Sequence, residues 1–202
     1  MYNYYNMFQA GCFHIVVADE IDLAEIRAIY NSNRAFLLNH TGSGADAVDL
    51  VGSVGSVGSV DLVGSVGSVG SVDSVDDEWC LQEYREMLGG GFLRCMILGA
   101  EGGSEGGPAI GFMDFKVSEE TYLSLLMLLG GRQRRGIGRE VYRGFEEYIR
   151  GLNSKRIRID VVTGYDGSSL GFWLSNGFVA EKEVMLSWGE NKFPAQKMIK
   201  EL

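Results

Sequence analysis

The sequence predicts a single mixed domain of the α/β or α+β class, with helices packed around one central sheet. Its 202 residues fit one domain of ordinary size. Strand-like and helix-like patterns of apolar residues follow one another in the order βααβββαβαββ. A low-complexity segment between the first two helices interrupts this order. We therefore expect one domain over residues 1–202 that carries an insertion.

The N-terminal part of the chain contains one predicted strand and two predicted helices. Residues 13–18, "FHIVVA", are typical of a strand. Asp22 with Glu25 three places later predicts a capping box at the start of the first helix. The second helix is expected over residues 76–88, ended by the glycines at 89–91. One face of the first helix is apolar, formed by Leu23, Ile26, Ile29 and Tyr30.

Three strands are expected in the middle of the chain. Residues 92–100 and 109–117 are two apolar segments, and the glycine-rich loop 101–108 between them indicates a hairpin. Residues 121–129, "TYLSLLMLL", are almost continuously apolar. Such a pattern is typical of a strand that is buried on both faces.

The C-terminal part contains two further helices and three strands. Apolar residues recur at helical spacing over 141–152, and residues 155–162 alternate like a strand. Residues 168–178 predict a short helix that ends at a glycine. Residues 179–188 and 195–202 predict the last two strands.

The low-complexity segment repeats the twelve letters "VDLVGSVGSVGS" at residues 48–59 and again at 60–71. Its basic period of three matches neither a helix nor a strand, so its valines line no single face. A glycine in every Val-Gly-Ser unit raises the entropic cost of ordering the chain. We therefore expect a flexible insertion at 42–77, in an exposed loop between helices 1 and 2. A solenoid turn or a partner-binding arm is the alternative.

Charge and composition narrow the function classes. The formal charge is −9, and six aspartates without any Lys or Arg lie between residues 42 and 77, which leaves 18 − 21, or −3, for the rest. The overall charge of −9 disfavours nucleic acid as a partner, because the phosphate backbone must be neutralised by Lys and Arg. Cys12, Cys80 and Cys95 form no CxxC pair and indicate reduced thiols. The two histidines have no ligand-like spacing, so no metal site is expected. Neither a signal peptide nor a membrane-spanning run is present, which predicts a cytoplasmic protein with no membrane contact.

The stretch "GGRQRRGIGRE", residues 130–140, concentrates four glycines and four arginines just before a predicted helix. Glycines let the backbone turn and expose N–H groups, and the first turn of a helix has unpaired N–H donors and a positive dipole end. Guanidinium groups add donors that suit phosphate oxygens. The stretch therefore predicts a site for a ligand that carries a pyrophosphate. A solvated arginine-rich loop with a glycine cap is the plain alternative.

Two nucleotide-binding motifs also place glycines at the start of a helix. A P-loop needs a Gly-Lys-Ser or Gly-Lys-Thr triplet, and the chain has none. An NAD-type dinucleotide turn is the stronger rival, because Gly136 and Gly138 begin a helix and Asp160 ends the next strand about twenty residues later. Val141 stands where a third small residue is expected, and the roughly forty residues after Asp160 are too few for a second nucleotide-binding half.

The sequence resembles the GNAT superfamily of acyl-CoA N-acyltransferases. Residues 133–138 match the family's phosphate-loop form Q/R-x-x-G-x-G/A, and "FWLSNGF" at 172–178 is similar to its F-[YW]-x-x-x-G-F ending. The resemblance implies a mixed, mostly antiparallel sheet flanked by helices and splayed at strands 4 and 5. It also implies an acetyl-CoA-dependent N-acetyltransferase that acetylates a primary amine of a small molecule or peptide. A non-catalytic acyl-CoA-binding module is the alternative, and a homodimer is left open.

The resemblance also implies which residues contact the cofactor. Backbone groups of the fourth strand would pair with the pantetheine and acyl carbonyl, and the loop would hold the pyrophosphate. Asp166 stands where the family often has an Asn that contacts the cofactor arm. The implied cofactor-binding residues are Leu126, Met127, Leu128, Gln133, Arg134, Arg135, Gly136, Ile137, Gly138, Arg139 and Asp166.

The catalytic groups are less well defined. The amine acceptor must lose a proton before it attacks the thioester, so a base or a water chain is required. The family often has a Glu near the position of Leu125, and a Tyr where this chain has Trp173. Tyr165 is the candidate acid by its position, although a packing residue with a surface hydroxyl would explain it. Asp114 and His40 are weaker candidates. A role as a solvated strand residue would explain Asp114, and a role as a polar loop residue would explain His40.

Overall fold

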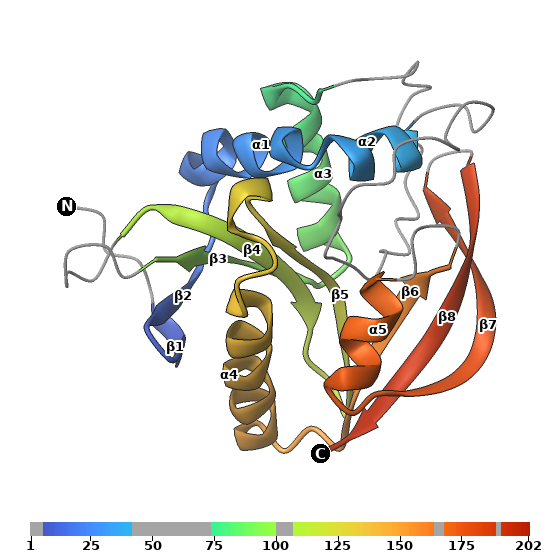
Figure 1. Cartoon of the computed structure of the whole chain (residues 1–202). Helices are drawn as coiled ribbons and strands as arrows, with labels where there is room; N and C mark the ends of the chain where they lie inside the picture. The colour runs from blue at the N-terminus through green and yellow to red at the C-terminus, as the bar shows by residue number, and fades with distance from the viewer. Residues whose placement is uncertain (1–5, 42–73, 100–106, 164–167, 189–190) are drawn as a thin grey trace.

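The computed structural model describes residues 6–41, 74–99, 107–163, 168–188 and 191–202 (Figure 1). Within them, strands pair into one mixed sheet of order β1-β2-β3-β4-β5-β6-β8-β7. The strands are β1 (Asn6–Ala10), β2 (Phe13–Val17), β3 (Leu93–Leu98), β4 (Ala109–Lys116), β5 (Glu120–Leu128), β6 (Arg156–Val162), β7 (Val179–Trp188) and β8 (Asn191–Glu201). The helices are α1 (Leu23–Ser32), α2 (Arg34–Thr41), α3 (Asp77–Gly89), α4 (Ile137–Gly151) and α5 (Ser168–Ser175), with 3-10 turns η1 (Glu20–Asp22) and η4 (Gly130–Arg132).

Helices cover the two faces of the sheet as separate layers. Figure 1 shows α1, α2 and α3 grouped on one side of the strands and α4 and α5 on the other. Side chains alternate along each strand, so neighbouring residues enter different cores. In β2, Ile15 packs in the core that contains Phe145 of α4, whereas Val16 packs in the core that contains Ile29 of α1. Both cores depend on the same central strands.

The sheet opens between β5 and β6. These two strands are parallel and pair only at Glu120–Tyr122 with Arg156–Arg158, whereas β6 pairs with β8 along its whole length. In β5, Ser124 has no opposite residue, because Asp114 pairs with Leu125 and Phe115 pairs with Leu123. This is a β-bulge, which bends a strand and re-aims its edge. The expected splay between the fourth and fifth predicted strands is confirmed, and it leaves one edge of β5 unpaired from Leu123 onward.

The predicted order of elements is confirmed except for one additional strand at the N-terminus and the additional helix α2. An additional strand, β1, pairs antiparallel with β2 through a two-residue turn at Gly11 and Cys12. Gly11 has φ +57°, as a tight hairpin of this kind requires. The last strand also begins earlier than expected, at Asn191.

The first predicted helix differs in its start and its length. The expected capping box of Asp22 with Glu25 is wrong, because the short turn η1 precedes α1. Asp19 caps that turn, and the Asp22 carboxylate accepts the N–H of Asp19 at 2.8 Å. The helix also breaks at Asn33, with φ −109° and ψ 50°, and continues as α2. The second predicted helix, α3, begins close to its expected start, where the Asp76 side chain caps the helix by accepting the N–H of Trp79 at 2.9 Å.

Most of the expected insertion at 42–77 lies outside the described residues. The structure begins again at Ser74, ahead of α3. Val75 is buried there, and its N–H and C=O form hydrogen bonds of 2.8 and 3.0 Å with the side chain of Asn31 in α1. These two bonds fix the start of α3 to α1.

Candidate functional site

The arginine-rich loop lies between the end of β5 and the start of α4. Gly136 is the N-cap of α4, with φ +82°, and no side chain in the described part of the chain caps this end of the helix. Its C=O accepts the N–H groups of Arg139 and Glu140, both at 3.1 Å. The N–H groups of Ile137 and Gly138 precede these bonds and, among the residues that the structure describes, are the unpaired donors of the first helical turn. Together with the positive end of the helix dipole, they form a site that favours an anion.

The glycines leave this site open. A Cβ atom built on Gly136 would have no heavy atom within 4 Å, so this position faces free space, yet its positive φ disfavours other residues. A Cβ on Gly138 would lie 3.7 Å from the Phe172 ring of α5. Hence α5 forms the wall beside the first turn of α4.

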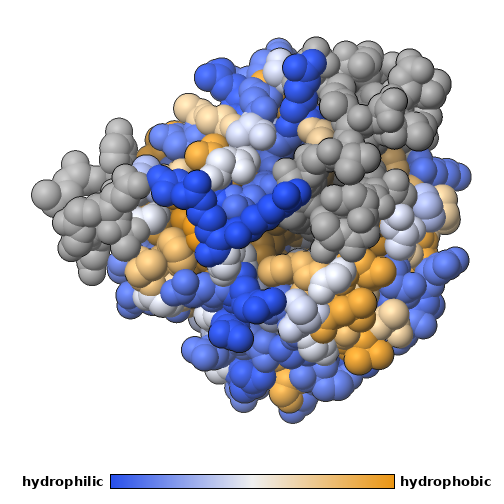
Figure 2. Space-filling model, viewed as in Figure 1, coloured by the Kyte–Doolittle hydropathy of each residue, from blue (hydrophilic) through white to orange (hydrophobic). Residues whose placement is uncertain are grey.

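Exposed arginines surround the loop. Arg134, Arg135 and Arg139 are exposed, and Arg134 has the left-handed φ of +59°. Within the described residues, neither Arg134 nor Arg135 has a hydrogen bond or an ion pair. Figure 2 shows strongly hydrophilic residues over the loop and the start of α4, next to hydrophobic residues over α5. A charged surface therefore borders an apolar one at this end of α4.

The free edge of β5 is defined by the pairing of its last residues. The N–H of Leu129 donates to the C=O of Ile110 at 2.8 Å. Because antiparallel pairing alternates with a period of two, the backbone groups of Met127 also face β4, opposite Phe112. Those of Leu126 and Leu128 point away from β4, toward the opening between β5 and β6. Among the three strand residues expected to contact a cofactor, the geometry favours Leu126 and Leu128.

Gln133 has a different position from the other loop residues. Its side-chain Nε2 donates to Oδ1 of Asn33 at 2.6 Å and to the C=O of Leu128 at 3.3 Å. Nδ2 of Asn33 also donates to the C=O of Leu128, at 2.9 Å. Gln133 thus anchors the loop to β5 and α1. Sequence reasoning missed Asn33, whose only signal is a polar residue within a helical pattern.

The candidate catalytic residues are only partly described. Tyr165, Asp166 and the side chain of His40 lie outside the described residues. Trp173 is 1% exposed and packs against Tyr142 and other aromatic rings of the α4–α5 core. It is therefore a core residue.

Asp114 is part of a buried charge cluster, and its interpretation as a solvated strand residue is wrong. Arg94 donates to Asp114 at 2.8 and 2.6 Å and to Glu83 at 2.7 and 3.0 Å. The Arg94 and Asp114 side chains are 0% exposed and that of Glu83 is 5% exposed. Burial raises the pKa of Asp114 to about 6, against the lowering effect of Arg94, and the nearby Glu83 carboxylate adds to the rise. Asp114 therefore supports α3 and the sheet and is inaccessible to a substrate.

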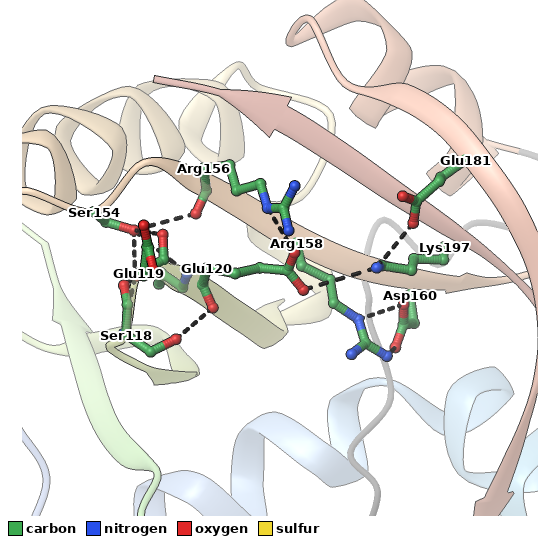
Figure 3. Close-up of polar contacts among 10 residues, drawn as sticks. Ser118, Glu119, Glu120, Ser154, Arg156, Arg158, Asp160, Glu181 and Lys197 are labelled. Carbon is green, nitrogen blue, oxygen red and sulfur yellow. Dashed lines mark hydrogen bonds and ion pairs between the residues drawn. The ribbon is translucent and has the colours of Figure 1, made fainter.

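A second charge network joins the strands where β5 and β6 are still paired (Figure 3). Glu120 of β5 forms an ion pair of 2.7 Å with Arg156 of β6. Two residue pairs further on, Arg158 binds Asp160 through two hydrogen bonds of 3.1 and 2.6 Å and lies 4.9 Å from the centre of the Tyr122 ring. The network closes β5 onto β6 just before the two strands separate.

Comparisons with known proteins give a consistent result at the level of structure only. The sequence matches no model of a protein family, and no curated protein matches it. Solved structures match it at low identity. "RimL ribosomal L7/L12 alpha-N-protein acetyltransferase" in apo form has a TM-score of 0.68 at 12% identity, covering 100% of this chain and 96% of that chain.

Two ligand-bound structures also match. Spermidine N-acetyltransferase from Vibrio cholerae, in complex with CoA and spermine, has a TM-score of 0.60 at 11% identity, with 94% of this chain and 95% of that chain covered. The putative acetyltransferase yncA from Salmonella typhimurium, with acetyl-CoA, has a TM-score of 0.55 at 15% identity, with 94% and 93% covered.

Two kinds of feature are absent from the described part of the chain. None of its helices combines the length and the apolar character needed to cross a membrane. In the same residues, no group of three or more His, Cys, Asp or Glu side chains is placed to hold a metal ion.

Proposed function

We propose, from the premise that this chain has the fold of the GNAT N-acetyltransferases, that it is an acetyl-CoA-dependent N-acetyltransferase. One observation carries the proposal. The unpaired amides at the start of α4 lie just beyond the free edge of β5, next to the opening between β5 and β6. A single extended ligand with a diphosphate and an amide-containing arm can contact both features.

The residues at this site fit the parts of coenzyme A. The N–H groups of Ile137 and Gly138 and the guanidinium groups of Arg134, Arg135 and Arg139 suit a diphosphate. Gly136 leaves room for close approach, since no atom lies within 4 Å of its Cβ position. Acetyl-CoA would supply an acetyl group activated as a thioester.

The β5 edge suits the rest of the donor. The outward N–H and C=O of Leu126 and the outward N–H of Leu128 can pair with the amides of a pantetheine arm, as a further strand would pair with an unpaired sheet edge. The C=O of Leu128 already accepts from Asn33 and Gln133. Aliphatic side chains are compatible with this role because only the backbone takes part. The β-bulge at Ser124 aims this edge away from β6.

The acceptor is proposed to be a primary amine of a small molecule or a peptide. Structural relatives are described as acting on a ribosomal protein or as binding spermine with CoA, which supports this class. The amine must be neutral to attack, so a proton has to be removed by a residue or through water. Tyr165 remains the proposed acid, from its sequence position alone.

An acyl-CoA-binding module and an NAD-type binding protein are the two alternative functions. An acyl-CoA-binding module without turnover is favoured by the core position of Trp173 and by the absence of a Glu near Leu125. An NAD-type site is disfavoured, because both carboxylate oxygens of Asp160 accept hydrogen bonds from Arg158 and the side chain is 0% exposed. A ribose hydroxyl would have to displace that guanidinium.

Two measurements test the proposal. Thermal unfolding with acetyl-CoA, CoA or NAD identifies the ligand, because a ligand that binds only the folded state raises Tm. We expect a shift with acetyl-CoA and CoA, and stabilisation by NAD alone would overturn the proposal. Thiol release is then followed with a panel of polyamines, amino acids and peptides. Binding of acetyl-CoA without release of thiol for any acceptor would favour the binding module.

A further inference from the structure

The segment between the β5 edge and the phosphate loop is held by a buried pair of side-chain amides. Asn33 lies between α1 and α2 and is 4% exposed. Its Nδ2 donates to the C=O groups of Ile29 and Leu128 at 2.7 and 2.9 Å. Its Oδ1 accepts from Nε2 of Gln133 at 2.6 Å. We call Asn33, Gln133 and the C=O of Leu128 the amide clasp.

A second contact strengthens the same junction. Oγ of Ser32 accepts the N–H of Gly130 at 2.9 Å. A Cβ on Gly130 would lie 2.6 Å from the C=O oxygen of Ser32, so the chain comes too close for any other residue here. Ser32 and Asn33, at the end of α1, therefore contact the first half of this connection at two points, Gly130 and Gln133.

This junction matters because it joins the two surfaces assigned to the donor. The β5 edge ends at Leu128 and the diphosphate amides begin at Ile137. The chain between them includes two consecutive glycines and a left-handed Arg134, which few local forces would hold in one conformation. Gln133 reaches back five residues to Leu128 and fixes the start of that connection.

We propose that Asn33 is a positioning residue for acetyl-CoA, which acts through the amide clasp to hold the phosphate loop in register with the β5 edge. The inference rests on the proposed function and adds to it a residue on the opposite layer of the fold. Asn33 binds the C=O of Leu128 at the end of the β5 edge, and it reaches the phosphate loop only through Gln133. Its effect is to spare the ligand the cost of ordering the loop.

The test replaces Asn33 with Ala and compares it with Asn31→Ala. Asn31 lies two residues earlier, in the last turn of α1, and its side chain also forms two hydrogen bonds to backbone, but to Val75. By isothermal titration calorimetry, Asn33→Ala should weaken CoA binding about tenfold, and Asn31→Ala by less than about twofold. Adenosine 3′-phosphate 5′-diphosphate, which lacks the pantetheine arm, should lose affinity to the same extent as CoA in Asn33→Ala.

Hydrogen exchange provides a readout that is independent of the ligand. Amides of residues 130–136 should exchange faster in Asn33→Ala than in Asn31→Ala, with no change in the β3 and β4 strands. Gln133→Leu removes the other side chain of the amide clasp, at a partly exposed position. This variant replaces Asn33→Ala in both measurements if Asn33→Ala does not fold. The double variant should lose no more CoA affinity than either single variant, because both remove one unit.

Three results would overturn the inference. Unchanged exchange of residues 130–136 would mean that the clasp does not hold the loop. Equal losses of CoA affinity in Asn31→Ala and Asn33→Ala would mean that the loss comes from a general loss of stability and not from the amide clasp. If the unaltered protein does not bind CoA, the proposed function fails and the positioning role fails with it, while faster exchange in Asn33→Ala would mark the clasp as purely structural.

Discussion

Gly136 is the residue on which the donor site depends most directly. It combines φ +82° with open space around its Cβ position. We predict that Gly136→Asp weakens CoA binding by at least about a hundredfold, equal to roughly 2.7 kcal/mol. The new carboxylate would occupy the space for the diphosphate and repel it. Calorimetry with CoA measures the loss.

The control for this variant is Gly151→Asp, which places the same charge at the other end of α4. A Cβ on Gly151 has no atom within 4 Å, and its φ is outside the left-handed region. CoA affinity should stay within about twofold there, since charges beyond the Debye length of ~10 Å are largely screened. Unchanged CoA affinity in Gly136→Asp would refute the assignment of the loop.

Asp114 makes the stability of the fold depend on pH. Its pKa of about 6 in the folded state lies above the usual 3.8. The stabilisation linked to its proton is therefore complete below pH 3.8 and is lost as the pH rises through 6. Relative to the unaltered protein, Asp114→Asn should gain about 2 kcal/mol of unfolding free energy between pH 4 and pH 7.

Urea unfolding of both proteins across this pH range measures the difference. Glu147→Gln, at an exposed position of α4, is the control for losing a carboxylate. A difference between Asp114→Asn and the unaltered protein that does not change with pH would contradict the raised pKa. It would mean that Arg94 offsets the burial of both carboxylates.

For single residues, the sequence predicted the chemical character of the loop better than it predicted which side chains contact each other. The open glycines and exposed arginines of the loop could be expected because each depends on a local property, such as a positive φ or a charged head group. The roles of Gln133 and Asp114 could not, since each is set by a partner that is remote in sequence. Asn33 lies 100 residues from Gln133, and Arg94 lies 20 residues from Asp114.

At the scale of elements, the approach of α4 to β1 depends on a glycine inside the helix. A Cβ on Gly144 would lie 2.5 Å from Cβ and 2.8 Å from Cα of Ala10. Gly→Ala within a helix normally stabilises by about 0.5–1 kcal/mol. Here we predict that Gly144→Ala destabilises by about 2 kcal/mol, because the methyl group would force the hairpin away.

Gly151→Ala is the matched control in the same helix. Its methyl group meets no atom within 4 Å, so stability should stay the same or rise slightly. Thermal unfolding should show a Tm lowered by about 5 °C for Gly144→Ala alone. Equal Tm values for the two variants would mean that the β1–β2 hairpin moves freely relative to α4.

This contact also explains why the sequence did not reveal β1. Its five residues, "NMFQA", do not alternate between apolar and polar side chains, and among them only Ala10 is buried. The strand is held by pairing with β2 and by the close approach of Gly144, neither of which has a signal within the strand. By contrast, β5 was predictable because its apolar run is nearly continuous and buried on both faces.

At the scale of the whole molecule, the sequence indicated which segments are strands better than it indicated how they pair. The place of β8 between β6 and β7 depends on pairs such as Asp160 with Lys197, which no local pattern reveals. The opening between β5 and β6 was expected only through the family resemblance. Its physical cause, a bulge at Ser124 together with charge pairs at the closed end, became visible only in the structure.

The last prediction concerns the repeat, which the sequence marks as an insertion. We propose that residues 48–74 contribute little to folding or to the donor site, because a three-residue period with glycine in every unit presents no apolar face to a core. A deletion of these residues keeps Val75, whose bonds to Asn31 fix the start of α3. Shortening the connection should leave the unfolding free energy unchanged or raise it by about 1 kcal/mol, through the smaller cost of loop closure.

Urea unfolding and CoA titration of the shortened chain test this prediction. CoA affinity should stay within about twofold, because the amide clasp and the loop before α4 are left intact. A loss of more than about 2 kcal/mol of unfolding free energy would show that the repeat packs on the domain, since loop closure alone changes stability in the opposite direction. Unaltered stability with weaker CoA binding would instead place the repeat at the donor site.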